Sequence, residues 1–194
     1  MSRSIGLLAV MCVLTGCIEK FSPSEYLGLA SQYDVIIERD HRGVPHVRGE
    51  RDVDAAFGFA YAQSEDNWQI IHDSVAFYRG TNAAGKGKEA AIIDFLIKWL
   101  GIWDVIESDY ETKLSAPTRA YIEAFADGVN YYAALHPETT DRNIFPITGK
   151  DVVAGYMLRH LLFYGFDSVL AEILGEQRQH SISRGPTTEV VATG

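Results

Sequence analysis

Cysteine is nearly absent from this sequence. The chain has two cysteines, Cys12 and Cys17, and both lie in an apolar segment at the N-terminus. If this segment is removed by processing at Cys17, no pair of thiols remains for a disulfide or for a cysteine-based metal site. We therefore expect the folded part to be held together by side-chain packing alone.

Clustered positive charge is also lacking. The 17 Lys and Arg residues are outnumbered by 26 Asp and Glu residues, so the formal net charge at pH 7 is -9. Nucleic-acid binding requires a concentrated basic surface, and no basic stripe is present. The sequence therefore argues against a nucleic-acid partner. The content of 47% hydrophobic and 22% charged residues is typical of a globular domain.

Long apolar runs are missing, apart from one short run near the N-terminus. Arg3 precedes the apolar residues 5–14, and Leu14-Thr15-Gly16-Cys17 follows as a small-residue cleavage site that ends in cysteine. The run is shorter than the ~20 apolar residues that span a bilayer as a helix. The segment resembles a bacterial lipoprotein signal over residues 1–17, with an ordinary signal peptide as the alternative.

The lipoprotein interpretation predicts where the protein resides. Cys17 would carry the lipid, and the protein would be a membrane-anchored lipoprotein of the periplasm. Residues 18–33 include Ser22, Pro23 and Gly28 and show little apolar periodicity. We expect them to form a tether between the anchor and the folded part.

The most definite structural pattern begins at Asp34. Residues 35–37 are β-branched, and residues 44–47 resume an extended pattern after a charged stretch. Gly43 can adopt a positive φ in the connection, which predicts a β-hairpin. After Asp52, a plausible N-cap, small and apolar residues recur at helical spacing as far as Ile70. This spacing predicts a long helix.

These residues resemble a known family. Arg39-Asp40, Gly43-Val44-Pro45-His46 and the stretch 57–66 are similar to the N-terminal part of the α subunit of penicillin acylase-type N-terminal nucleophile hydrolases. Residues 62–67 resemble the acyl-homoserine lactone and aculeacin acylase branch. The resemblance implies an α+β fold over residues 34–176, mostly helical with an N-terminal β-hairpin. It also implies that a β subunit completes a four-layer αββα sandwich.

Two further helices follow from the sequence. Ser115-Ala116-Pro117 is typical of a helix start, an aromatic and apolar stripe follows, and His136-Pro137 ends it. Gly128 inside this helix is expected to permit close helix packing. Residues 152–166 are apolar on nearly all sides, so this helix is expected to be buried or to line an apolar cavity.

The resemblance assigns two kinds of site to the last helices. It implies that the α subunit contributes to an acyl-binding pocket, for which the candidates are Leu161, Leu162, Phe163 and Phe166. Plain core packing is the alternative for these four. It also implies that Glu172 reaches a structural calcium ion, although the spacing here is longer by one residue. Such a shift rotates a helical side chain by about 100°, and a solvated carboxylate is the alternative. No organic cofactor is expected.

A complete catalytic set is not recognisable in the sequence, which has neither His-Glu-x-x-His nor Gly-x-Ser-x-Gly. In the family that this chain resembles, the nucleophile is the first residue of the β subunit, and its α-amine acts as the base. Residues 177–194 are then a connecting segment, and maturation would cleave after Gly194.

The resemblance therefore implies an amidohydrolase precursor whose α part is inactive by itself. Its partners would be the β subunit of the same precursor and a small acyl-amide substrate, with N-acyl homoserine lactones first and penicillin-type side chains second. Two alternatives stay open from the sequence: a non-catalytic periplasmic lipoprotein that binds or scaffolds, and a truncated, inactive acylase.

Overall fold

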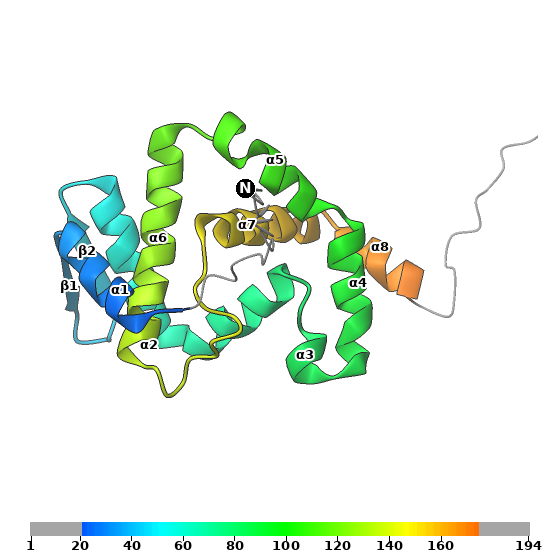
Figure 1. The fold of residues 1–194 in the computed structure, drawn as a ribbon, viewed down its shortest axis with the longest axis horizontal. Coiled ribbons are helices and arrows are strands. Elements are labelled where there is room, and N and C mark those ends of the chain that lie inside the picture. The colour runs from blue at the N-terminus through cyan, green and yellow to red at the C-terminus, as the bar shows by residue number, and fades with distance from the viewer. Residues whose placement is uncertain (1–20, 175–194) are drawn as a thin grey trace, which may run out of the picture.

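The computed structural model describes residues 21–174, with a single two-stranded antiparallel sheet and helices in this range (Figure 1). Cys17 and Gly194 lie outside the described residues. None of the helices in this range is both long and apolar enough to cross a membrane. The elements are α1 (Pro23–Leu29), η1 (Ala30–Gln32), β1 (Val35–Arg39), β2 (Pro45–Gly49), α2 (Asp52–Tyr78), α3 (Ala83–Lys86), η2 (Lys88–Ala90), α4 (Ala91–Trp99), α5 (Ile102–Lys113), α6 (Ala116–Leu135), α7 (Gly149–Phe163) and α8 (Phe166–Leu174).

The predicted hairpin is confirmed. Strands β1 and β2 pair antiparallel, with Val35 opposite Gly49 and Arg39 opposite Pro45. Gly43 has a φ of 80° in the connection. The Asp40 carboxylate accepts hydrogen bonds from the backbone N–H groups of Arg42, at 2.8 Å, and Val44, at 3.0 Å. These bonds fix the turn, and they lower the pKa of Asp40.

The hairpin is fastened to α2 through residues that carry the family resemblance. The Arg39 guanidinium lies 2.9 Å from a Glu65 carboxylate oxygen and 3.0 Å from one of Asp66. On the same helix, Gly58 faces Val35 and Val47 so closely that an added Cβ would collide with both side chains. The residues that carry the family resemblance therefore dock the hairpin on α2.

The start of α2 differs slightly from the prediction. Arg51 is the N-cap, and Asp52 is the first helical residue. The buried side chain is Asp54, which is 1% exposed and accepts hydrogen bonds from the Asp34 and Arg51 N–H groups and from the Arg51 side chain. The Arg51 hydrogen bond outweighs desolvation and lowers the pKa of Asp54 to about 2.

The tether predicted for residues 18–33 is folded in its described part, so that prediction was wrong there. Helix α1 packs against α6, and Phe21 is buried in the core. The Phe21 ring stacks on Tyr26, with 5.4 Å between centroids, and contacts Phe145 edge-on. The main buried ring, Phe21, precedes α1, and no residue of α1 itself is fully buried, so the sequence shows no apolar periodicity there.

Helices α2 and α6 form the centre of the fold. Gly128 of α6 lies against the Phe57 carbonyl and 2.9 Å, measured from an ideal Cβ, from the Ala60 methyl group. Buried alanines on both helices, including Ala56, Ala60 and Ala124, keep the contact close. The role predicted for Gly128 is confirmed. The predicted bounds of α6 also agree, because Ser115 caps its start and the helix ends before His136.

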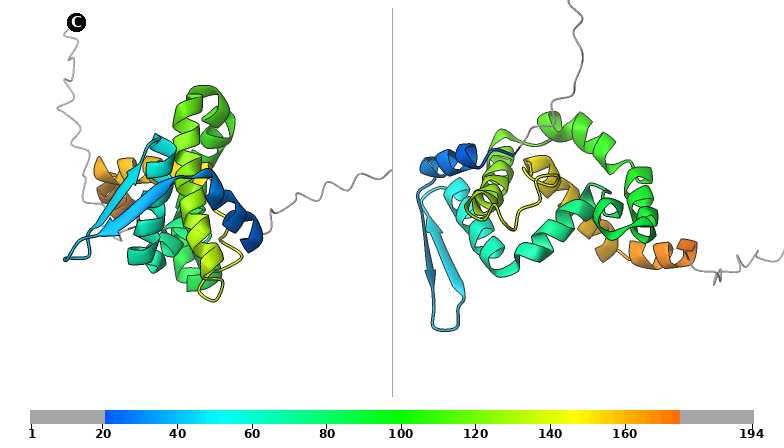
Figure 2. Two further views of the ribbon diagram at one scale, coloured as in Figure 1. Left: turned by 90° about the vertical axis from the view of Figure 1, so that its left-hand side faces the viewer. Right: turned by 60° about the horizontal axis from the view of Figure 1, so that its bottom comes forward.

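The helices after α2 enclose a second core around α7. Helix α4 ends at Trp99, and Gly101 turns the chain with a φ of 64° into α5. Ile97, Ile102, Ile106 and Tyr110 pack against Ala154 and Leu158 of α7. Figure 2 shows that the hairpin lies at one end of the molecule and α4 with α8 at the other.

The depressed pKa of Asp54 makes a pH-dependent contribution to stability. Its folded pKa of about 2 lies below the unfolded value of roughly 3.9, so the ionised group stabilises the fold above about pH 4. This contribution is lost as the pH falls from about 4 towards 2. The difference in melting temperature between Asp54→Asn and wild type should therefore be largest above about pH 4 and should shrink below it. Circular dichroism melts across this range measure it.

The control for this prediction is Asp52→Asn, because Asp52 lies two residues away and is exposed. It should leave the melting temperature nearly unchanged throughout the pH range. A destabilisation by Asp54→Asn that is the same at every pH would contradict the assignment.

A second prediction concerns the contact between α2 and α6. In Gly128→Ala the added methyl group meets backbone atoms of α2, which cannot move independently. The helices must separate, and we expect the free energy of unfolding to fall by about 2–3 kcal/mol. Chemical denaturation measures this loss.

The matched control is Gly28→Ala in α1, where nothing lies within 4 Å of an added Cβ. That variant should be unchanged or more stable by up to about 1 kcal/mol, because alanine restricts the unfolded chain. Equal effects of the two substitutions would show that Gly128 is not needed for close packing.

Candidate functional site

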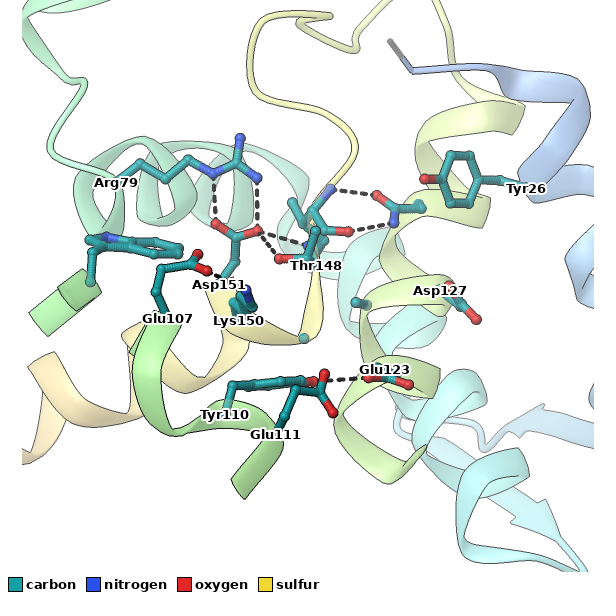
Figure 3. Close-up of a pocket in the computed structure, with 15 residues that line it drawn as sticks. Tyr26, Arg79, Glu107, Tyr110, Glu111, Glu123, Asp127, Thr148, Lys150 and Asp151 are labelled. Atoms are coloured by element: carbon teal, nitrogen blue, oxygen red, sulfur yellow. Dashed lines mark hydrogen bonds and ion pairs between the residues drawn. The ribbon is translucent and has the colours of Figure 1, made fainter. Parts of the chain in front are cut away.

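Two large hollows lie on the described part of the chain. The polar hollow, of about 790 Å³, is formed mainly by α5, α6 and the start of α7 (Figure 3). The apolar groove, of about 660 Å³, runs between α2, α6 and α7. The polar hollow is lined by Tyr26, Arg79, Trp103, Glu107, Tyr110, Glu111, Glu123, Ala126, Asp127, Asn130, Ile147, Thr148, Gly149, Lys150 and Asp151.

A partly buried ion pair lies at one side of the polar hollow; its carboxylate is buried and its guanidinium is partly exposed. The Arg79 Nε and Nη2 atoms lie 2.6 and 2.7 Å from the two Asp151 carboxylate oxygens. Asp151 also accepts hydrogen bonds from the Thr148 N–H and hydroxyl groups, at 2.7 and 2.9 Å. Arg79 donates further to the Ile144 and Pro146 carbonyls. This bidentate pair therefore ties the end of α2 to the start of α7 and to the segment before it.

Asn130 holds the same segment from the opposite side. Its Nδ2 atom donates to the Ile147 carbonyl at 2.8 Å, and its Oδ1 atom accepts from the Ile147 N–H at 2.9 Å. Asn130 is 1% exposed. Because both of its polar atoms are used by the backbone, it is a structural clamp.

The far wall of the polar hollow carries carboxylates paired with tyrosines. The Tyr33 hydroxyl donates to Asp127 at 2.6 Å, and the Tyr110 hydroxyl donates to Glu123 at 3.2 Å. Burial raises the pKa of both tyrosines, and it is also the main cause of the raised pKa of Asp127. The tyrosines therefore stay protonated near neutral pH. They serve as hydrogen-bond donors and cannot act as phenolate nucleophiles.

The apolar groove has a different chemistry. Its walls include Phe59 and Ile70 of α2, Phe125 of α6 and Tyr156 of α7, and most of its surface is carbon. At Asn67 the backbone leaves the helical region, with φ -140° and ψ 36°, so α2 is kinked beside the groove. A groove of this size and character can accommodate an apolar group.

The four predicted acyl-pocket residues do not meet in one cavity. Leu162 and Phe166 line a small apolar hollow together with Leu100 and Leu158. Leu161 is 37% exposed and Phe163 is 82% exposed, so both face outward. Of the two predicted alternatives, burial or the lining of an apolar cavity, burial fails for Leu161 and Phe163, whereas Leu162 of the same turns lines the small hollow. The assignment of the four residues to an acyl pocket stays a prediction.

Glu172 lies in α8 and is partly exposed. Within residues 21–174, no three His, Cys, Asp or Glu residues are grouped so that they could hold a metal ion. Calcium normally takes six to eight oxygen ligands. The described residues therefore do not fit a calcium site by themselves, and calcium binding through Glu172 stays a prediction.

Sequence reasoning missed the residues that build the polar hollow. Two signals could have found them. Thr148 and Asp151 stand three residues apart, which is the spacing of a capping box. Asn130 directly follows Gly128-Val129, part of the helical stretch that resembles the acylase family. Arg79 gave no such signal, because its partner is 72 residues away.

Comparison with known proteins shows to which family this chain is similar. A family model described as penicillin amidase matches residues 34–176. The acyl-homoserine lactone acylase PvdQ of Pseudomonas fluorescens (strain Pf0-1) is 26% identical over 170 residues, which are 80% of this chain and 21% of that protein. The penicillin acylase 2 proenzyme of Pseudomonas sp. (strain SE83) is 34% identical over 102 residues, 52% of this chain and 13% of that protein. The chain thus spans only a small part of these two relatives.

A solved structure shows the same fold. The thermostable penicillin G acylase from Alcaligenes faecalis superimposes with a TM-score of 0.60 and 20% sequence identity. The match covers 82% of this chain and 98% of that chain. The predicted fold class, a mostly helical α-subunit portion with a small β-hairpin, is therefore confirmed.

The clamp at Asn130 yields a testable prediction. Asn130→Ala leaves the Ile147 N–H and carbonyl groups buried without partners. Each such group costs ~1–3 kcal/mol, so the loss of two partners should lower the free energy of unfolding by about 2–6 kcal/mol. Chemical denaturation measures the loss. Asn143→Ala, at an exposed turn, is the control and should stay within about 0.5 kcal/mol of wild type. Comparable stability of the two variants would disprove the clamp.

Proposed function

Because the chain belongs to the penicillin amidase family, we propose that it is the α-subunit part of an acylase precursor that hydrolyses linear amide bonds. The observation that carries this proposal is the family match over residues 34–176. The agreement in fold with a penicillin G acylase chain supports it.

The nucleophile would come from a β subunit encoded after Gly194. Its N-terminal hydroxyl or thiol would attack the amide carbonyl, while the α-amine of the same residue takes the proton and passes it to the leaving amine. An α-amino pKa near ~8 suits this exchange at neutral pH. Water would then hydrolyse the acyl-enzyme and release a carboxylic acid. The chemistry of the polar hollow supports this division, because its polar groups are occupied by hydrogen bonds and ion pairs.

This chain would contribute the scaffold and part of the acyl site. The apolar groove and the small hollow at Leu162 and Phe166 supply apolar lining, as an acyl chain requires. We propose N-acyl homoserine lactones as the first substrate class and penicillin-type acyl amides as the second. The names of the two curated relatives support both classes.

The cellular setting belongs to the same proposal. The lipoprotein-like segment that ends at Cys17 supports a lipid anchor and a periplasmic location. Glu172 is proposed to join a structural calcium site whose other ligands lie outside the described residues.

The decisive experiment compares this chain with the product of its gene extended beyond the Gly194 codon. We expect the extended product to release amine from N-octanoyl homoserine lactone or penicillin G, and the chain of 194 residues to release none. Substituting alanine for the first residue after Gly194 should lower the rate by at least about 1,000-fold, because the nucleophile is lost. Mass spectrometry of the products measures the rate.

The opposite results would overturn the proposal. Turnover by the chain alone, at the rate of the extended product, would require a nucleophile within this chain. A stop codon directly after Gly194 would leave no nucleophile in cis and would favour a truncated acylase or a non-catalytic lipoprotein.

A further inference from the structure

The apolar groove is a concave space between the faces of three helices. Its α7 side consists of Val152, Gly155, Tyr156 and Arg159. The spacing of these positions places them on one face of the helix. A single face of α2 and part of α6 form the other walls. A volume of about 660 Å³ lies within the range of small-molecule sites, so the groove is large enough to hold a ligand.

Contacts at the end of α2 hold two walls of the groove together. Gly155 of α7 lies so close to the Tyr78 ring that an added Cβ would be 2.5 Å from a ring carbon. At the next residue, Arg79 forms its bidentate pair with Asp151 of α7. Tyr78, Gly155 and Asp151 all border the groove. The walls are therefore set by contacts within this chain, whether or not another part of the precursor closes the groove.

Among the described residues that line the groove, Arg159 carries the one charge that is not neutralised. The other charged residue of the lining is Asp151, which is 2% exposed and is paired with Arg79. Arg159 is exposed, and within residues 21–174 it has no hydrogen bond or ion pair. The chain as a whole has a net charge of -9. A free guanidinium beside an apolar lining can therefore receive an anionic group.

A carboxylate that shares a hollow with Arg159 is engaged elsewhere. Arg159 also borders a smaller hollow that is lined in part by Asp73. One Asp73 oxygen lies 3.2 Å from the Lys86 ammonium group, and the other accepts a hydrogen bond from Gln69 at 3.0 Å. The hydrogen bond from Lys86 is the main cause of the lowered pKa of Asp73. Both oxygens of Asp73 are therefore used by groups other than Arg159.

The two ends of the groove differ in chemistry. Phe59 and Phe125 line it with their rings 6.2 Å apart, and Phe59 directly follows Gly58, which packs on the hairpin. Arg159 lies towards the other end of α2, because the smaller hollow that it borders is lined by Phe77 and Tyr78. A ligand that matches both ends has an apolar tail and an anionic head.

We propose that the apolar groove binds a monocarboxylic acid with an apolar tail. The tail lies against Phe59 and Phe125, and the carboxylate pairs with Arg159, whose planar guanidinium can donate two hydrogen bonds to it. The choice of a carboxylate rests on the proposed function, because hydrolysis of an acyl amide releases such an acid. The binding itself requires no turnover. Arg159 thus makes the groove a site for the acid product.

The experiment measures the affinity for sodium octanoate by isothermal titration calorimetry. It uses the product of the gene extended beyond Gly194, or this chain if a stop codon follows. Arg159→Met keeps the apolar stem of the side chain and removes its charge. It should bind octanoate at least about 10-fold more weakly, because a hydrogen-bonded charge pair is lost. It should bind uncharged 1-octanol as the wild type does.

A second variant tests the place of the tail. Ser74 lines the groove from α2, and Ser74→Phe puts a ring into the space that the ligand needs. It should weaken the binding of octanoate and of 1-octanol alike, by at least about 10-fold, because the apolar tail no longer fits. The matched control is Arg142→Met, at an exposed arginine outside the groove. It should bind both compounds as the wild type does.

Three results would overturn the proposal: no binding of octanoate, an affinity that neither Arg159→Met nor Ser74→Phe changes, or equal weakening by Arg159→Met and Arg142→Met. The second result would place the acid elsewhere in the precursor. Failure here is distinguishable from failure of the proposed function. Amide hydrolysis without octanoate binding leaves the acylase reaction intact and removes this site, whereas octanoate binding through Arg159 without amide hydrolysis does the reverse.

Discussion

The close contact between α2 and α6 is the constraint on which the rest of the structure depends. Gly128 lets the two helices meet at the level of the Phe57 carbonyl. The hairpin then docks on α2 beside this contact through Arg39 and Gly58, and α1 packs on α6. The polar hollow and the apolar groove both use α6 as a wall. A change in the spacing of these helices would therefore alter the docking of the hairpin, the polar hollow and the apolar groove together.

Polar groups in the interior of this protein serve mainly to position segments. Asp54, Asn130 and Asp151 are nearly inaccessible, and each is paired with backbone groups or with an arginine. Buried polar groups are costly unless they are satisfied, so these networks specify one arrangement of the connections between helices. This organisation agrees with the proposal that the nucleophile lies in another part of the precursor.

Local features were predictable, and long-range pairings were not. The hairpin, the start of α6 at Ser115 and the break at Gly101 could be predicted, because each depends on turn or capping residues within a few positions of each other. The fold of residues 21–32 was missed because Phe21 is buried by α6 and Phe145, far away in sequence. The exposure of Leu161 and Phe163 was missed because apolar composition does not state what covers a helix.

The sequence by itself determined the secondary structure of the central elements and the family, because both depend on residues that are close together in the chain or on a run of motifs. Only the tertiary structure decided which polar residues form networks, since Arg79 and Asp151 are 72 positions apart. It alone showed that Asp94 is turned inward while Phe95 and Trp99 face outward. Burial is a property of packing between helices, and packing is not encoded in the periodicity of any one of them.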